Sequence, residues 1–112
     1  MRGRGSKGKM SKAVEAAARG RYIMISVNPP VYTYLGVASD YVLVDESYCS
    51  CESFATILRR GKRECKHILG LYVAREKGKI LVNKLPPRDV SRIVIETMLT
   101  GRASTLRSLI KM

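Results

Sequence analysis

All three cysteines of this chain and its single histidine lie in one short window, residues 49–67. Cys49 and Cys51 are two positions apart, as are Cys65 and His67, and thirteen residues separate the two pairs. Thiolate sulfur and imidazole nitrogen are the ligands that Zn²⁺ takes in structural sites. The pattern therefore predicts one zinc ion per chain, in a closed Cys₃His site that leaves no coordination position for a substrate.

The spacing within each pair sets conditions on the local structure. Tetrahedral zinc with Zn–S bonds of about 2.3 Å needs its sulfurs about 3.8 Å apart, whereas same-face neighbours on a straight strand are roughly twice that far apart. A strand carrying Cys49 must therefore bend or end before Cys51, and the small Ser50 allows this. Residues two apart in mid-helix point to nearly opposite sides, so Cys65 must precede a helix whose first turn contains His67.

Three other interpretations of the cluster remain open. A disulfide would leave one of the three cysteines unpaired, and disulfides are rare inside cells. A catalytic Cys–His pair would need a third group to orient the histidine, and the sequence shows none. Inert buried cysteines beside a core histidine have no reason to cluster. Zinc accounts for all four residues, and we take it as the prediction.

The elements around the window predict an α+β domain. Three runs rich in β-branched and aromatic residues, separated by turn signals, predict a three-stranded antiparallel meander at 22–28, 31–37 and 41–49. Apolar residues at helical spacing predict a helix from Cys65 to Gly78, with a short strand at 79–82 after it. Residues 52–64, between the two ligand pairs, are expected to form a loop on a zinc-stabilised β-β-α unit.

Two further helices are predicted beyond this unit, at 88–100 and 104–111, with Pro86-Pro87 opening the first and Gly101 ending it. Their apolar residues are expected to be mostly core, with any remainder available to a protein partner; these residues are Ile93, Val94, Ile95, Met98, Leu99, Leu106, Leu109 and Ile110. We divide the chain into a basic arm with a short Ala-rich helix (1–20), a zinc domain (21–82) and a C-terminal helical segment (83–112).

The net charge of +12 is strongly partitioned along the chain. Residues 1–21 carry seven Lys or Arg against one Glu, residues 22–58 carry four acidic residues and no Lys or Arg, and residues 59–112 carry fourteen basic against four acidic residues. Basic extensions on a less basic body are typical of proteins that bind a polyanion, most often nucleic acid. A basic surface that serves only solubility is the alternative, and anionic membrane surfaces are a minor one.

Two basic groups are the candidates for contact with phosphates. The first comprises Arg59, Arg60, Lys62 and Arg63 between the ligand pairs, with Lys66 just beyond them. Arginine binds phosphate bidentately, and a zinc-held frame would position the group. The alternative is that its charges offset the thiolates of the metal site. The second group is the Gly-rich arm, whose basic residues include Arg2, Arg4, Lys7 and Lys9. Tyr32 and Tyr34 share a strand face and would either stack on bases or pack in the core.

The motif C-x-C followed by C-x-H at the start of an apolar helix, behind a hairpin ending in "YCSC", resembles the SWIM zinc finger over roughly residues 31–74. The resemblance implies zinc on Cys49, Cys51, Cys65 and His67, in a module that binds DNA or protein. A free-standing chain this small is similar to the Shu-type SWIM proteins, which pair with recombinase paralogues in homologous recombination. The absence of Gln and the presence of only two Asn fit a thermophilic source such as an archaeon.

The sequence therefore predicts a cytoplasmic, non-catalytic protein, because its one histidine is assigned to zinc and no apolar run approaches the about 20 residues of a membrane-spanning helix. We expect nucleic acid as a ligand, DNA rather than RNA, together with a protein partner such as a recombinase paralogue. No small-molecule substrate and no membrane are expected. The alternative is a protein adaptor whose basic surface meets an acidic partner and does not touch nucleic acid.

Overall fold

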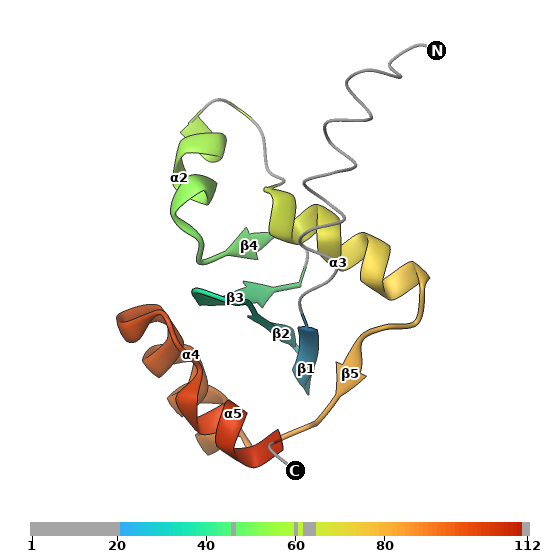
Figure 1. Ribbon diagram of the computed structural model, residues 1–112, viewed down its shortest axis with the longest axis vertical. Helices are drawn as coiled ribbons and strands as arrows, with labels where there is room; N and C mark the ends of the chain where they lie inside the picture. Colours follow the sequence, from blue (N-terminus) through green and yellow to red (C-terminus); the bar gives the residue numbers. More distant parts are fainter. Residues whose placement is uncertain (1–20, 46, 60, 62–64, 111–112) are drawn as a thin grey trace.

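A computed structural model describes residues 21–45, 47–59, 61 and 65–110, and it confirms the α+β class. The described residues form one five-stranded sheet with helices on both of its faces (Figure 1). The strands are β1 (Arg21–Val27), β2 (Pro30–Leu35), β3 (Asp40–Val44), β4 (Tyr48–Cys49) and β5 (Leu81–Val82). The helices are α2 (Glu52–Arg59), α3 (Lys66–Glu76), α4 (Pro87–Thr100) and α5 (Ser104–Ile110). The predicted arm and Ala-rich helix, residues 1–20, lie outside the described residues.

The predicted antiparallel meander is confirmed as the centre of the sheet. The strand order is β4-β3-β2-β1-β5, and Thr33 of β2 lies opposite Ile23 of β1 and Val42 of β3. The β2–β3 turn requires glycine at position 36, because a Cβ there would lie 2.5 Å from the carbonyl oxygen of Ser39. The short strand predicted at 79–82 is β5, which pairs in parallel with β1 at the edge of the sheet.

The run 41–49, predicted as one strand, is two strands in the structure. Asp45 adopts a positive φ of 54°, which turns the chain so that Tyr48 pairs back on Val44 and Cys49 on Leu43. Aspartate tolerates this left-handed conformation better than most residues. The prediction missed the turn because the β-rich residues on both sides of it form one continuous run.

Each face of the sheet has its own core, because the alternating side chains of the central strands are buried on both sides. On one face Tyr22, Tyr34 and Leu43 pack with Ile68 and Leu71 of α3. On the other face the buried residues come from β1, β2, β3, α4, α5 and the turn between the two helices; they are Ile23, Ile25, Val31, Leu35, Val42, Ile93, Ala103 and Leu106. Figure 1 shows α3 on one side of the strands and α4 with α5 on the other.

Residues 52–59, expected in a loop, form helix α2. The helix begins directly after Cys51, with an acidic residue in its first turn and Arg59 in its last, which suits the helix dipole at both ends. Phe54 is buried and meets the ring of Tyr48 edge-on, with 5.5 Å between the ring centroids. The prediction was wrong because Ser53, Thr56 and Ile57 are only moderate helix formers, and the burial of Phe54, which favours the helix, depends on packing against β4.

The helix predicted at 88–100 is confirmed as α4, which begins at Pro87 and ends at Gly101, a left-handed residue with φ of 79°. The expectation that its apolar residues are mostly core is wrong for three of them. Ile93 is fully buried, but Ile95, Met98 and Leu99 are 57%, 51% and 80% exposed. The inner face of α4 is narrower than the apolar stretch of sequence, so these three side chains face solvent. Leu109 of α5 is also half exposed.

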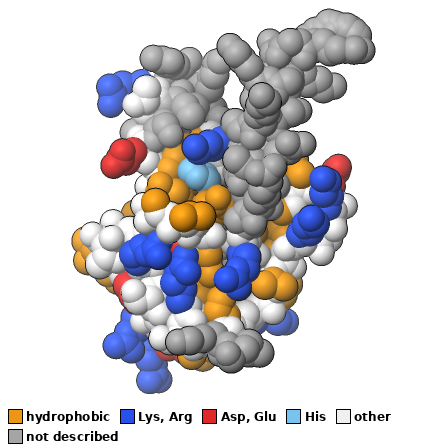
Figure 2. Space-filling view, in the orientation of Figure 1, with side chains coloured by type: hydrophobic (Ala, Val, Ile, Leu, Met, Phe, Trp, Pro, Cys, Tyr) orange, Lys and Arg blue, Asp and Glu red, His pale blue; other side chains and the backbone are white. Residues whose placement is uncertain are grey.

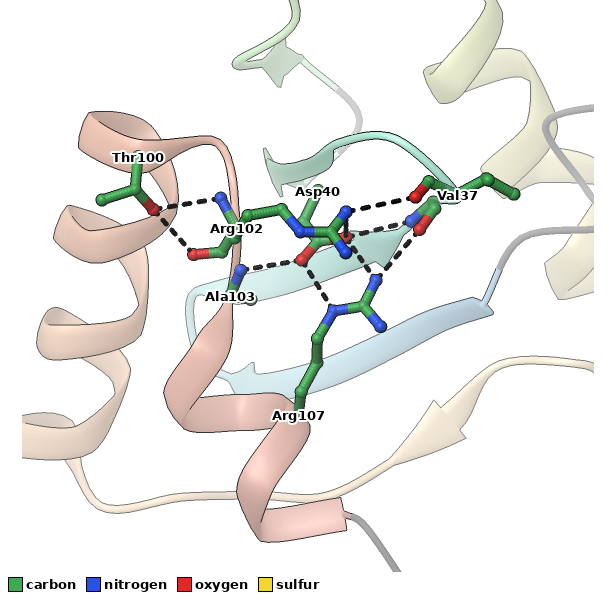
Figure 3. Close-up of polar contacts among 7 residues, drawn as sticks. Val37, Asp40, Thr100, Arg102, Ala103 and Arg107 are labelled. Atoms are coloured by element: carbon green, nitrogen blue, oxygen red, sulfur yellow. Dashed lines mark hydrogen bonds and ion pairs between the residues drawn. The ribbon is translucent and has the colours of Figure 1, made fainter.

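A buried carboxylate joins α5 to the β2–β3 turn (Figure 3). Asp40 is almost fully buried at the start of β3, and its oxygens accept hydrogen bonds from the backbone N–H groups of Gly36 and Ala103. Arg107 of α5 donates to both carboxylate oxygens and also to the carbonyl of Gly36. Arg102 lies farther away, with its Nη1 atom 3.8 Å from Oδ1 of Asp40. The network fixes the position of the two C-terminal helices on the sheet.

Within the described residues, no helix combines the length and the apolar character that crossing a bilayer requires.

Candidate metal centre

The first ligand pair lies where the edge strand β4 ends, as the spacing predicted. Cys49 is the last residue of β4 and Cys51 directly precedes α2. Ser50, between them, is held against β3 by two hydrogen bonds, in which its N–H donates to the carbonyl of Val42 and its Oγ accepts from the N–H of Val42. The strand therefore stops at Ser50, and both cysteine side chains are buried.

The second pair lies at the start of α3, again as predicted. Cys65 is the N-cap residue with extended backbone, and its carbonyl accepts from the N–H of Leu69. His67 is the second residue of the helix and is also buried. Because α3 packs on the face of the sheet that carries Tyr22 and Leu43, its N-terminus lies against β4, and the two ligand pairs converge.

The four side chains form a compact cluster of the kind that holds a metal ion. The candidate ligand atoms of Cys49, Cys51, Cys65 and His67 all lie within 4.8 Å of one another. Tetrahedral zinc would bring the sulfurs to about 3.8 Å, so a small contraction completes the site. No disulfide joins the three cysteines, and within the described chain this is the one grouping of three or more metal-ligating residues.

The imidazole of His67 supports the fit of a metal ion. Its Nδ1 atom is buried and has no hydrogen-bond partner in the part of the chain that the structure describes. A buried polar atom without a partner is costly, and coordination by a metal ion would remove that cost. Figure 2 shows part of the histidine side chain, coloured pale blue, between hydrophobic side chains and a basic one.

Three tyrosines of the sheet hold His67 in place. The ring centroids of Tyr34 and Tyr41 lie 4.8 and 4.6 Å from that of the imidazole, and the hydroxyl of Tyr22 donates a 2.6 Å hydrogen bond to the carbonyl of His67. Burial is the main reason that the pKa values of Tyr22 and Tyr34 are raised above their ordinary range, so both stay neutral. Neutral, packed rings orient the histidine without adding charge to the site.

The idea that Tyr32 and Tyr34 stack on nucleic-acid bases is not consistent with the structure, because both rings are buried. Tyr32 instead packs in the core and accepts a hydrogen bond from Arg75 at 2.8 Å. Packing in the core, the alternative for these two tyrosines, is therefore what the structure shows, and the contact of Tyr34 with the histidine was not predicted. The signal that could have made this connection is the hairpin register, which places Tyr34 directly opposite Tyr41.

The neighbouring thiols and burial disfavour ionisation of Cys49 and Cys65. Hydrogen bonds with Cys51 and Cys65, together with burial, raise the pKa of Cys49 far above its ordinary value. At Cys65 a hydrogen bond with Cys49 lowers the pKa, but a hydrogen bond with Cys51 and burial outweigh it. Three buried thiolates need a neighbouring positive charge, and a divalent metal supplies it.

Two of the predicted phosphate-binding residues lie in the described chain. Arg59 ends α2 and Lys66 begins α3, so both exposed side chains belong to the helices that follow the two ligand pairs. The other members of the two basic groups, Arg60, Lys62, Arg63, Arg2, Arg4, Lys7 and Lys9, lie outside the described residues.

Comparison with models of protein families, with curated proteins and with solved structures found no match to this chain.

Proposed function

We propose that the cluster holds one structural Zn²⁺ and that the zinc-held domain is a non-catalytic module that binds nucleic acid inside the cell. The observation that carries the zinc assignment is the convergence of three buried thiols and a buried imidazole within 4.8 Å. Nitrogen and sulfur ligands in a closed tetrahedral set are typical of structural zinc. The ion would join the end of β4 to the start of α3.

The charge distribution supports nucleic acid as the ligand. Basic residues are concentrated before residue 22 and after residue 58, while the sheet-forming segment between them is acidic. The exposed Arg59 and Lys66 extend this pattern to the surface beside the metal cluster. Such an arrangement favours contacts with the phosphate backbone, which give affinity without sequence information.

The ligand order C-x-C, C-x-H and its β-β-α setting are similar to the SWIM zinc finger. On that similarity we propose an accessory role in DNA recombination or repair, with DNA preferred to RNA and with a protein partner of the recombinase-paralogue kind. The second candidate function is a protein adaptor without direct contact to nucleic acid. The exposed apolar residues of α4 favour it, since they provide a surface that phosphates cannot use.

Titration of the purified full chain with labelled single- and double-stranded DNA over a range of salt distinguishes the two functions. If log K of DNA binding falls linearly with the logarithm of the salt concentration, the result supports the nucleic-acid module, because each neutralised phosphate releases a counterion. If the zinc-containing protein binds neither form of DNA at low salt, the protein adaptor becomes the favoured function.

A further inference from the structure

The solvent-facing side of α4 is basic at its N-terminal half and apolar at its C-terminal half. At about 100° per residue, six of its exposed side chains fall within an arc of about 120° on the side away from the sheet. We call this set the outer stripe; it comprises Arg88, Ser91, Arg92, Ile95, Met98 and Leu99. The opposite side of the helix carries Ile93 and Thr97, which are buried.

The apolar half of the outer stripe is a contiguous patch. Ile95, Met98 and Leu99 are spaced i, i+3, i+4, so their side chains adjoin on one helical face, and all are at least half exposed. Isolated exposed apolar residues are ordinary on protein surfaces, but three adjoining ones on one rigid helix are typical of an interaction site. The inner face of the same helix is already seated on the sheet, so the patch is not needed for folding.

The charges on the outer stripe restrict what can cover it. Its only charged residues are Arg88 and Arg92. Neither of them forms an ion pair with an acidic side chain that the structure describes. Arg102 and Arg107 instead form ion pairs with Asp40. The hydroxyl and N–H of Thr105 donate hydrogen bonds to the carboxylate of Glu96 and lower its pKa, and the charge of Arg92 lowers this pKa further. A partner that covers the stripe must therefore bring its own acidic groups.

We propose that the outer stripe docks an amphipathic helix of a partner protein, with apolar residues against Ile95, Met98 and Leu99 and acidic residues against Arg88 and Arg92. Two helices pack well when i, i+3, i+4 ridges of one fill the grooves of the other, and about three turns of partner helix span the stripe. The outer stripe would be the surface that binds the protein partner named in the proposed function, and the inference rests on the existence of that partner.

Two other occupants fit the stripe less well. In a parallel pairing with a second copy of this chain, Arg88 and Arg92 would lie against the same arginines of the other copy. In an antiparallel pairing, they would lie against Ile95 and Leu99. Neither pairing places an acidic side chain of the stripe opposite the arginines. The net charge of +12 on each copy adds repulsion. A nucleic-acid backbone would pair with Arg88 and Arg92 and leave the apolar half exposed.

A displayed library of 18-residue helical peptides tests the proposal on the full chain. Apolar residues are fixed at i, i+3, i+4 and i+7, and the flanking positions are varied among Glu, Lys and Ser. Glu-flanked peptides should be enriched, and they should bind at least 10-fold more weakly to the triple variant Ile95→Gln, Met98→Gln, Leu99→Gln. The matched variant Val37→Gln, Leu81→Gln, Val82→Gln removes three exposed apolar side chains elsewhere and should bind as the parent does.

A charge-reversed variant, Arg88→Glu with Arg92→Glu, should select Lys-flanked peptides in place of Glu-flanked ones. Zinc content and DNA affinity are measured on each variant, so that loss of the metal domain or of nucleic-acid binding is distinguished from loss of docking. The proposal is overturned if no Glu-flanked peptide is enriched, or if enriched peptides bind the triple variant as well as the parent. It is also overturned if sedimentation shows a dimer that dissociates in the triple variant, since the occupant is then a second copy.

Discussion

Arg107 donates two hydrogen bonds to the carboxylate of Asp40, from Nε to Oδ2 at 2.9 Å and from Nη2 to Oδ1 at 2.7 Å. The two residues are 67 positions apart, and their pairing holds α5 against the β2–β3 turn (Figure 3). Planar, bidentate pairs of this kind are among the strongest side-chain hydrogen bonds. The C-terminal helices are therefore attached to the sheet by this pair as well as by the apolar residues around Ile93 and Leu106.

The Asp40 carboxylate makes stability depend on pH in the acid range. Burial disfavours its ionised form, but the hydrogen bonds from Arg107 and Ala103 outweigh this and hold its pKa below the ordinary 3.8. A group whose folded pKa is depressed contributes stability above its unfolded pKa, and this contribution is lost as the pH falls through the folded value. Urea unfolding should show the loss below about pH 4 in the parent and a smaller loss in Asp40→Asn.

At pH 7, Asp40→Asn should lower the free energy of unfolding by roughly 1 to 3 kcal/mol, because the partly exposed Arg107 loses the buried carboxylate that accepts its two hydrogen bonds. The matched change Arg102→Gln removes a longer, partly exposed pair and should cost less than about 1 kcal/mol. Equal stability of Asp40→Asn and the parent at pH 7 would show that the packing of α5 alone positions the C-terminal helices.

Thr33 is expected to be a stabilising site for substitution. It is fully buried at the centre of β2, and its hydroxyl has no hydrogen-bond partner among the described residues. Thr33→Val keeps the shape and the β-propensity and removes the unpaired hydroxyl, so the free energy of unfolding should rise by about 0.5 to 2 kcal/mol. The matched change Thr100→Val removes a hydroxyl that accepts from the N–H of Arg102, and it should destabilise. A destabilised Thr33→Val would indicate a partner such as buried water.

The basic group between the ligand pairs should set part of the salt dependence of DNA binding. Replacing Arg59, Arg60, Lys62 and Arg63 with Ser removes roughly four counterion-release events, so the slope of log K against log salt should shrink by about 3 to 4 on duplex DNA. The matched variant Lys77→Ser, Lys79→Ser, Lys84→Ser, Arg88→Ser, which removes four exposed basic residues elsewhere, should change the slope less. Equal changes in the two variants would mean that net charge alone is responsible.

The N-terminal arm is expected to add affinity without contributing to the fold. Deleting residues 1–10 removes Arg2, Arg4, Lys7 and Lys9, and should weaken DNA binding while zinc content and melting temperature stay unchanged. Binding isotherms of the full and shortened chains at three salt concentrations measure this. Identical isotherms would reduce the arm to a solubility segment.

The sequence predicted those elements whose signals are local. Pro87 and Gly101 mark the ends of α4, and the two-residue spacings of the ligands required a strand end at Ser50 and a helix start at Cys65, which the structure has. Contacts between distant residues were not predictable, because periodicity carries no information on partners. The Asp40–Arg107 pair therefore could not be predicted from the sequence. Helical periodicity places Ile93 and Ile95 on nearly opposite sides of α4, but it does not say which of the two faces the sheet.

The zinc content of the full chain, purified without added metal, tests the central claim most directly. Elemental analysis should find about one zinc per chain. The variant His67→Ala should contain much less zinc, and the end of β4 and the start of α3 should unfold in it. Tyr22→Phe, which removes the hydrogen bond to the His67 carbonyl but no ligand, should retain zinc. A metal-free parent protein whose melting temperature is unaffected by added zinc or by a chelator would contradict the account.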